Sequence, residues 1–241
     1  MKKIKPVALV TGAASTLGQA LCRKLAEEGY DLLLHYGHSR AKTQVLAREL
    51  TASGVKVILL PMDLSKPASA AAALKRALQG TGRLDLLVNN AARFDKTPVS
   101  AGYTRRWDEV FCVNTFAPFA LCAAAAPALT RASGAIVNIA DIYAETPLLP
   151  ARPAYCASKA ALVSLTKYLA RELAPRVRVN AVSPGVVTFP AGYVMKKRRK
   201  LVEKTALKRA GSPWEIAEAV WALASNRFIT GQVLRVDGGR F

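Results

Sequence analysis

A tyrosine and a lysine four residues apart could form a proton-transfer pair. Tyr155 and Lys159 lie in a segment with helical spacing, so their side chains project from one face. A phenol, with a pKa of about 10, is a poor acid or base at neutral pH, but a nearby ammonium group stabilises the phenolate and lowers that pKa. The pair could then pass a proton to a substrate oxygen or nitrogen while a nicotinamide delivers hydride.

A glycine-containing turn follows the first apolar run and could bind a pyrophosphate. Residues 11–18 read Thr-Gly-Ala-Ala-Ser-Thr-Leu-Gly and lead into a helical pattern. Glycines allow backbone amides to approach phosphate oxygens, and the helix N-terminus favours the negative charge. We therefore predict that Gly12, Ser15 and Gly18 bind the pyrophosphate and that Leu17 also contacts the cofactor.

The segment after the second apolar run favours NADPH over NADH. A carboxylate at this place would bind the ribose hydroxyls of NAD, but residues 35–40 contain no acid. His38, Ser39 and Arg40, with Tyr36 beside them, suit a 2′-phosphate. A solvated basic loop is the alternative interpretation.

Residues after the third and fourth apolar runs complete the predicted cofactor site. Asp63 could accept a hydrogen bond from the adenine amino group while Leu64 flanks the ring, although Asp63 could equally cap the next helix. Asn90 and Ala91 follow the fourth run and are predicted to contact the cofactor.

The composition is that of a globular, strongly basic protein. Of 241 residues, 51% are hydrophobic and 21% charged, which argues against disorder. Lys and Arg number 35 against 16 Asp and Glu, giving a net charge of +19. Such a chain should meet anions readily, whether nucleic acid, membrane, nucleotide or acidic protein. The recognition patterns of nucleic-acid-binding proteins are missing, so no specific nucleic-acid role is expected.

Cysteine usage and hydropathy favour a cytoplasmic protein without metal or membrane sites. The four cysteines have no metal-ligand spacing and are interpreted as reduced thiols. The N-terminal apolar stretch is too short for a signal peptide. The longest apolar run, residues 116–129, contains two prolines and is too short to span a bilayer.

Short apolar runs alternate with helical stretches along the whole chain. The predicted strands are Val7–Val10, Asp31–Tyr36, Val55–Leu60, Leu84–Asn89, Ala135–Ile139, Arg178–Val182 and Gln232–Val236. The predicted helices are Leu17–Gly29, Ala41–Gly54, Ala68–Gly80, Tyr103–Arg131, Ala154–Leu173 and Trp214–Ser225. This alternation predicts an α/β fold: one doubly wound parallel sheet of Rossmann type, seven strands, with helices on both faces. We expect a single domain over residues 1–241, with ligands beyond the carboxyl ends of the strands.

These motifs together resemble the short-chain dehydrogenase/reductase family over essentially the full length. The matching pieces are Thr11–Gly18, Asp63, Asn89-Asn90-Ala91, Asn114, Tyr155 with Lys159, Pro184-Gly185 and Val236-Asp237-Gly238-Gly239. The resemblance implies that Asn114 orders a water in a proton relay with Tyr155 and Lys159, and that Lys159 binds the nicotinamide ribose. It also implies that the backbone at Pro184, Gly185 and Val187 holds the carboxamide, and that the protein is a homotetramer.

Two departures from the family pattern point to one branch of it. Asp141 replaces the usual catalytic serine, and Phe94 stands where a flat aromatic could cover the substrate. In both, the chain is similar to the pteridine reductases, including the dihydromonapterin reductases. A serine hydroxyl suits a carbonyl oxygen, whereas reduction of a ring C=N bond requires a proton on nitrogen. A carboxyl group beside Tyr155 can hold pterin nitrogens and help to supply that proton. The resemblance thus implies NADPH-dependent reduction of a dihydropterin or dihydrofolate, with Phe94, Asp141 and Tyr155 as substrate-binding residues.

Other interpretations remain open at the level of sequence. Asp141 could cap the following segment, and Phe94 could be ordinary pocket wall. Thr16 stands where that branch usually has arginine, and Asp141 and Tyr155 are 14 residues apart where 13 is usual. The enzymatic alternative is an NADPH-dependent carbonyl reductase, such as a 3-oxoacyl-[acyl-carrier-protein] reductase. A basic scaffold or nucleotide-sensing binder without turnover is the non-enzymatic one.

A basic run falls in the variable region, about residues 188–210, that closes over substrate in this family. Residues 195–200 read Met-Lys-Lys-Arg-Arg-Lys. Three interpretations stand: a lid that attracts an anionic substrate, a dock for an acidic carrier protein, and a solvated helix face.

Overall fold

One seven-stranded parallel sheet runs through the molecule. The computed structural model describes residues 5–146, 149–188 and 195–240. The strands lie in the order β3-β2-β1-β4-β5-β6-β7. Their bounds are β1 Val7–Val10, β2 Asp31–Tyr36, β3 Val57–Pro61, β4 Leu86–Asn89, β5 Ala135–Ile139, β6 Arg178–Pro184 and β7 Val233–Val236. The order reverses between β1 and β4, which is where ligands bind in open α/β sheets.

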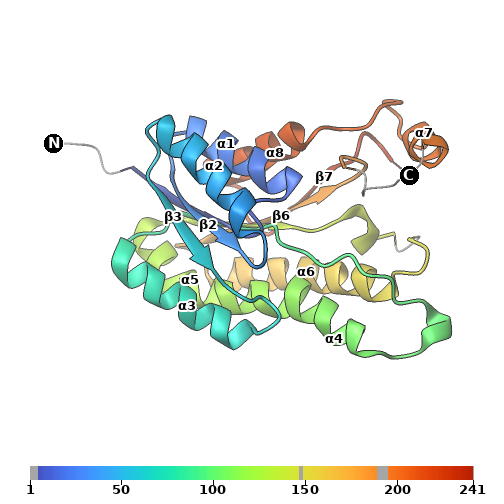
Figure 1. Ribbon diagram of the computed structural model, residues 1–241, viewed down its shortest axis with the longest axis horizontal. Coiled ribbons are helices and arrows are strands. Elements are labelled where there is room, and N and C mark those ends of the chain that lie inside the picture. The colour runs from blue at the N-terminus through green and yellow to red at the C-terminus, as the bar shows by residue number, and fades with distance from the viewer. Residues whose placement is uncertain (1–4, 147–148, 189–194, 241) are drawn as a thin grey trace.

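Helices cover both faces of this sheet (Figure 1). On one face lie α1 (Thr16–Glu27), α2 (Arg40–Ala52) and α8 (Pro213–Ser225). On the other lie α3 (Pro67–Thr81), α5 (Ala117–Ala132) and α6 (Pro153–Glu172). Two shorter helices, α4 (Arg105–Phe111) and α7 (Met195–Glu203), lie toward the carboxyl ends of the strands. The predicted doubly wound architecture is confirmed.

The core consists of two apolar clusters, one on each side of the sheet. Along β1, Ala8 and Val10 belong to the cluster beneath α1 and α8, whereas Leu9 belongs to the cluster above α3 and α5. Successive strand side chains point to opposite faces, so a strand covered on both sides must be apolar at every position. This explains why the strands could be read as continuous apolar runs.

The predicted helix Tyr103–Arg131 is wrong as one regular element. The structure has α4, then a π-helical turn η2 (Cys112–Phe116), then α5. The extra residue in the π turn shifts the helical register at Asn114, and such bulges frequently occur at functional sites. Hydropathy reads only the average period and does not reveal the turn.

The stretch Arg105–Ala132 is long and apolar enough to cross a membrane by composition alone. It has 28 residues, a mean hydropathy of 1.6 in its most apolar window, and half of that window is buried. Its buried residues include Leu121, Ala125 and Leu129, which pack in the core cluster with α3. This is the pattern of a core helix.

Strand ends differ from the prediction by one or two residues, because capping contacts are not visible in hydropathy. Val55 N–H donates to the Leu50 carbonyl and belongs to the end of α2, so β3 begins only at Val57. At the other end of the sheet, β6 continues to Pro184 and so reaches the predicted cofactor site.

Candidate functional site

The glycine turn after β1 is closed by a histidine from β2. Gly12 adopts φ +65° and donates its N–H to His35 Nδ1 at 3.0 Å. The other ring nitrogen, Nε2, lies 3.1 Å from the Met62 carbonyl oxygen and donates to it. Burial lowers the pKa of His35 to about 4, so the ring is neutral with its proton on Nε2. The Gly12 amide is therefore occupied, and the turn's shape is fixed by His35.

Gly18 brings α1 against the same turn. A Cβ at this position would lie 2.2 Å from the Gly12 carbonyl oxygen, so only glycine allows this approach. Ser15 is the N-cap of α1 and accepts the Gly18 N–H through Oγ at 3.0 Å. The first-turn amides of Thr16 and Leu17 have no acceptor within the helix. These amides, at the positive end of α1, are the groups that can receive a pyrophosphate.

Asn90 pins the turn to β4. Its Nδ2 donates to the Thr11 carbonyl at 2.7 Å, and the main-chain N–H groups of Asn90 and Ala91 both donate to Thr11 Oγ1. Ala91 Cα lies 3.1 Å from where a Gly12 Cβ would be. Asn90 is thus a structural support of the predicted cofactor site, with Ala91 forming its wall.

The predicted 2′-phosphate residues lie at the start of α2. Tyr36 ends β2, and the three residues His38, Ser39 and Arg40 are exposed. Ser39 occupies the N-cap of α2 without a capping bond from its side chain, so its hydroxyl is available. A cation, a hydroxyl and a helix N-terminus together suit an anionic group.

Asp63 and Leu64 differ in what they expose. Asp63 Oδ1 accepts from Ser65 N–H at 3.0 Å and from Ser65 Oγ at 2.7 Å, and these bonds lower the pKa of the Asp63 carboxyl. The N-cap of α3 is Lys66, so Asp63 is not that helix's cap. Leu64 is only 7% exposed and belongs to the core, which leaves mainly its backbone to flank a ring.

Tyr155 and the carboxyl group of Asp141 form the centre of the site. Tyr155 Oη donates to Asp141 Oδ2 at 2.6 Å, and Asp141 Oδ1 accepts from Tyr143 N–H at 3.0 Å. Asp141 therefore caps the 3₁₀ helix η3 (Ile142–Ala144) and at the same time accepts a hydrogen bond from Tyr155. The 14-residue spacing does not prevent this contact.

Lys159 is fully buried one helical turn from Tyr155. Its Nζ donates to the Ile139 carbonyl at 2.6 Å and lies 5.9 Å from the centre of the Tyr155 ring. Burial lowers the pKa of Lys159 to about 8.

The charge balance at Tyr155 differs from the sequence expectation. Burial and the Asp141 carboxylate raise the pKa of Tyr155 well above its usual value, rather than Lys159 lowering it. Burial also raises the pKa of Asp141, opposed by its hydrogen bonds and by Lys159 and Arg240. The carboxylate, not the ammonium, is the charge bonded to the phenol, so the phenol is held protonated.

Asn114 is placed by the π-helical turn. Its side chain makes two hydrogen bonds to the Arg93 main chain, at 2.8 and 3.0 Å, and Nδ2 also donates to Ser158 Oγ at 3.0 Å. Ser158 in turn donates to the Tyr155 carbonyl at 2.8 Å. Asn114 thus joins the loop after β4 to α6, the helix that carries Tyr155 and Lys159.

Phe94 stands directly over Tyr155. The ring centres are 4.7 Å apart with the planes at 90°, and the guanidinium of Arg152 covers the Phe94 ring at 4.2 Å. Phe94 is 40% exposed, so part of its surface remains open to a ligand. Arg152 is a site residue that the sequence pattern did not reveal.

The β6 end of the site is shaped by glycine. Gly185 N–H donates to the Val236 carbonyl at 3.0 Å, and a Cβ at Gly185 would lie 2.6 Å from Asp237 Cα. The closing segment after β7 therefore packs on Pro184 and Gly185. Val187 is partly exposed beyond them.

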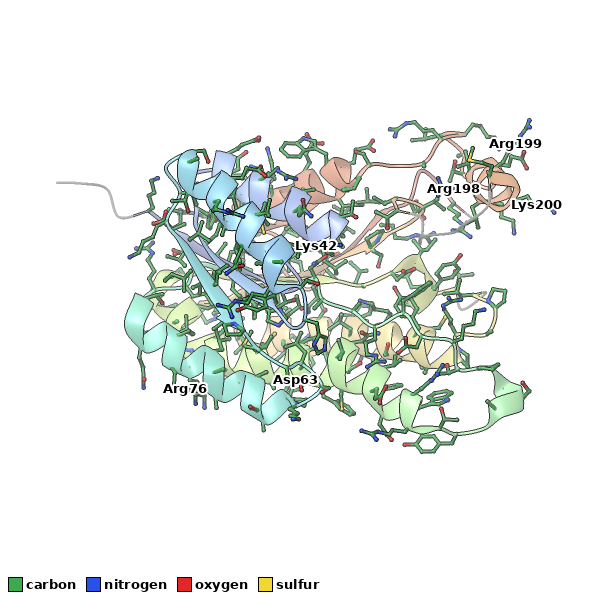
Figure 2. The ribbon with its side chains drawn as sticks, in the orientation of Figure 1. Lys42, Asp63, Arg76, Arg198, Arg199 and Lys200 are labelled. Carbon is green, nitrogen blue, oxygen red and sulfur yellow. The ribbon has the colours of Figure 1, made fainter. Side chains whose placement is uncertain are left out.

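The basic run forms α7 at one end of the molecule. Figure 2 shows Arg198, Arg199 and Lys200 on this helix. Arg199 Nε lies 3.2 Å from Glu203 Oε1. Of the predicted lid, residues 189–194 and the side chains of Lys196 and Lys197 lie outside the described part of the structure.

The residues present fit a dinucleotide with a 2′-phosphate. A turn that only glycine can form, open amides at α1 and an uncapped Ser39 beside Arg40 follow one another along one edge of the sheet. No group of three metal-binding side chains occurs among the described residues.

Comparisons with known proteins find oxidoreductases that match nearly the whole chain. A family model described as enoyl-(acyl carrier protein) reductase matches residues 12–240. An uncharacterized oxidoreductase of Methylorubrum extorquens is 35% identical, over 97% of this chain and 96% of the relative. The 3-oxoacyl-[acyl-carrier-protein] reductase FabG of Staphylococcus epidermidis is 34% identical, over 97% of this chain and 98% of the relative.

Two solved structures with bound cofactor are similar over nearly their whole length. A blue fluorescent protein from a metagenomic library, in complex with NADPH, has a TM-score of 0.90 and 32% identity, covering 97% of each chain. FolM alternative dihydrofolate reductase 1 from Brucella canis, complexed with NADP, has a TM-score of 0.88 and 33% identity. The match covers 98% of this chain and 93% of that one.

Proposed function

Because the chain belongs to the short-chain dehydrogenase/reductase family of nicotinamide-dependent oxidoreductases, we propose that it reduces a ring C=N bond of a dihydropterin or dihydrofolate with NADPH. The observation that carries this proposal is the 2.6 Å bond from Tyr155 Oη to Asp141. Reduction of a C=N bond leaves a nitrogen that must receive a proton, and this pair holds a proton beside an acceptor for N–H groups. The similarity to FolM from Brucella canis supports the same substrate class.

NADPH, when bound, supplies the hydride. Tyr155 carries the transferable proton at Oη, and its raised pKa keeps the phenol protonated until hydride addition makes the substrate nitrogen basic enough to take that proton. Asp141 accepts a hydrogen bond from that hydroxyl and can accept further hydrogen bonds from the amino and ring N–H groups of a pterin. We assign Lys159 to the nicotinamide ribose and Asn114 to a water that returns a proton to the relay.

The cofactor contacts follow from the turn and its neighbours. We assign the pyrophosphate to the turn formed by Gly12, Ser15 and Gly18, with Leu17 in its first helical turn. The group His38, Ser39 and Arg40, with Tyr36, is assigned to the 2′-phosphate. Asp63, Leu64, Asn90 and Ala91 are assigned to the adenosine half, and Pro184, Gly185 and Val187 to the carboxamide.

Phe94 is proposed to stack on the heterocycle. Arg152 covers one face of its ring, and the ring packs at 90° against the Tyr155 ring, so Phe94 is held by contacts on two sides. A fixed aromatic surface over the proton donor suits a flat substrate.

The test is NADPH consumption with dihydrobiopterin, dihydromonapterin and dihydrofolate, beside an acetoacetyl thioester. Tyr155→Phe is the blank because it removes the transferable proton while keeping the ring. Pterin turnover that is lost in this blank supports the proposal. Turnover of the thioester alone overturns it.

A carbonyl reductase is the second candidate. Relatives named as 3-oxoacyl-[acyl-carrier-protein] reductases favour it, and so does an apolar hollow of about 580 Å³ beside the site. Ala144, Leu149, Pro153 and Cys156 contribute to the wall of this hollow, which could receive an acyl chain. A basic α7 would suit an acidic carrier protein.

Substitution of Asp141 separates the two candidates. Asp141→Ser restores the hydroxyl typical of carbonyl reductases in this family, and Asp141→Asn keeps the shape without the negative charge. Under the pterin proposal both lose pterin turnover, by about ten- to a hundredfold for a charge-assisted hydrogen bond. Unchanged pterin turnover in Asp141→Ser would show that Asp141 has another role.

We also propose that the protein self-associates as a homotetramer in the cytoplasm. Phe116 and Phe119, 50% and 45% exposed, lie three residues apart on η2 and α5 and give one face an apolar surface. The four cysteines are free, which suits a reducing compartment. Light scattering on Phe119→Glu should show smaller particles, while Val45→Glu, on exposed α2, should keep the wild-type mass.

A further inference from the structure

The C-terminal end of the chain packs against the loop that follows β5. Arg240 Nη2 donates to Tyr143 Oη at 2.8 Å, and the Arg240 guanidinium lies 5.2 Å from the centre of the Tyr143 ring. The Arg240 main chain is itself held, by a bridge to Thr205 and by a 2.9 Å hydrogen bond from Arg235 Nη2 to its carbonyl. Arg240 is therefore held in a defined position by its main-chain contacts.

Tyr143 connects this arginine to the proton-transfer pair. Its N–H donates to Asp141 Oδ1 at 3.0 Å, while Tyr155 donates to Asp141 Oδ2 at 2.6 Å. The two carboxylate oxygens are thus held from opposite ends, one by the segment that Arg240 anchors and one by the phenol. If Tyr143 moved, Asp141 would lose the bond that orients it.

We propose that Arg240 is a positioning residue that, through Tyr143, aims the Asp141 carboxylate at Tyr155. The ionisable groups around Asp141 are Tyr155, Cys156 and Lys159 from α6, Tyr143 from η3 and Arg240 from the C-terminal segment. Among these Arg240 is the one cation outside α6. The inference rests on the proposed role of the Asp141–Tyr155 pair and holds for either substrate class.

The first test is kinetic, in the full-length protein with whichever substrate it turns over. Arg240→Met and Tyr143→Phe should each lower kcat about three- to tenfold, the value of one hydrogen bond, without changing the KM for NADPH. The double variant should lose no more than either single one, because both break the same connection. Arg240→Lys should recover part of the loss. Arg227→Met, an exposed arginine after α8, is the charge-matched control and should behave as wild type.

The second test needs no turnover, so it stands even if no pterin is a substrate. NMR of protein labelled with ¹³C at the aspartate carboxyl groups follows the titration of Asp141, assigned with Asp141→Asn. Loss of the Arg240 charge should move the Asp141 midpoint to higher pH in Arg240→Met, and leave it in place in Arg227→Met. The acidic limb of the kcat profile should move in the same direction. An unmoved midpoint, or additive losses in the double variant, would overturn the proposal.

Discussion

His35→Gln should change the pH dependence of stability more than any other single substitution in the cofactor half of the site. The wild-type ring accepts from Gly12 N–H and donates to the Met62 carbonyl, and it is 2% exposed. Gln has one acceptor and one donor as well, but it does not ionise. The variant therefore removes the titration while keeping the hydrogen-bonding capacity.

The magnitude follows from the pKa of His35, which burial lowers from 6.5 to about 4. Between these pH values the unfolded chain binds a proton that the folded protein does not, so acid favours unfolding. The free energy of unfolding therefore has its full value, as far as His35 is concerned, above about pH 6.5. It falls by about 3 kcal/mol as the pH decreases toward 4. At pH 7.5 the variant should be less stable than wild type by about 1–3 kcal/mol, because its contacts fit less well.

The assay is urea unfolding at pH 7.5, 6, 5 and 4 without cofactor. The difference between wild type and His35→Gln isolates His35, since every carboxyl group titrates in both proteins. Wild type should lose about 3 kcal/mol relative to the variant on acidification, so near pH 4 the variant should be as stable as wild type or up to about 2 kcal/mol more stable. His38→Gln, which removes the exposed histidine, should follow wild type. A difference that stays constant from pH 7.5 to 4 would refute the assignment of a neutral, buried His35.

Two further substitutions test the cofactor edge. Gly18→Ala should destabilise the protein by about 1–3 kcal/mol and weaken NADPH binding, because the new Cβ must push α1 off the Gly12 carbonyl. Gly80→Ala, where a Cβ would meet no atom within 4 Å, should instead stabilise α3 by about 0.5–1 kcal/mol, as measured for both variants by urea unfolding. Arg40→Gln should weaken NADPH binding about ten- to a hundredfold and leave NADH binding unchanged, as measured by titration calorimetry. Arg76→Gln, on α3 and away from α2 (Figure 2), should change neither affinity, and an equal loss for both cofactors in Arg40→Gln would exclude a 2′-phosphate contact.

The fold could be predicted from sequence because its signal is local. Each strand is buried on both faces and therefore apolar throughout, so β1, β2 and β5 were located to the residue. Residues that follow the strands lie at one edge of the sheet, as expected, because the carboxyl ends of parallel strands all lie there.

What sequence did not reveal depends on contacts between distant segments. His35 reaches Gly12 across 23 residues, and Arg240 reaches Tyr143 across 97. Arg240 does not stand out because an arginine is unremarkable in so basic a chain, and the position of His35 in the sequence does not show that its ring accepts from Gly12. The π-helical turn at Asn114 was missed for a related reason: one extra residue per turn barely alters the apolar period.

Lys159 provides an argument that function, rather than stability, determines this site. Burial lowers its pKa from 10.5 to about 8, so at neutral pH the folded protein holds an ammonium group where it is costly. Between pH 8 and 10.5 the folded protein gives up this proton before the unfolded chain does, so wild type should gain about 3 kcal/mol relative to Lys159→Met as the pH rises through that window. Near pH 7 the variant should therefore be at least as stable as wild type, although the Ile139 carbonyl loses its donor, while turnover is abolished. Lys167→Met, an exposed lysine on the same helix, should show no such pH-dependent difference. If Lys159→Met were strongly destabilised at pH 7 and remained so at pH 10.5, the lysine would be a structural residue and its place in the relay would lose its support.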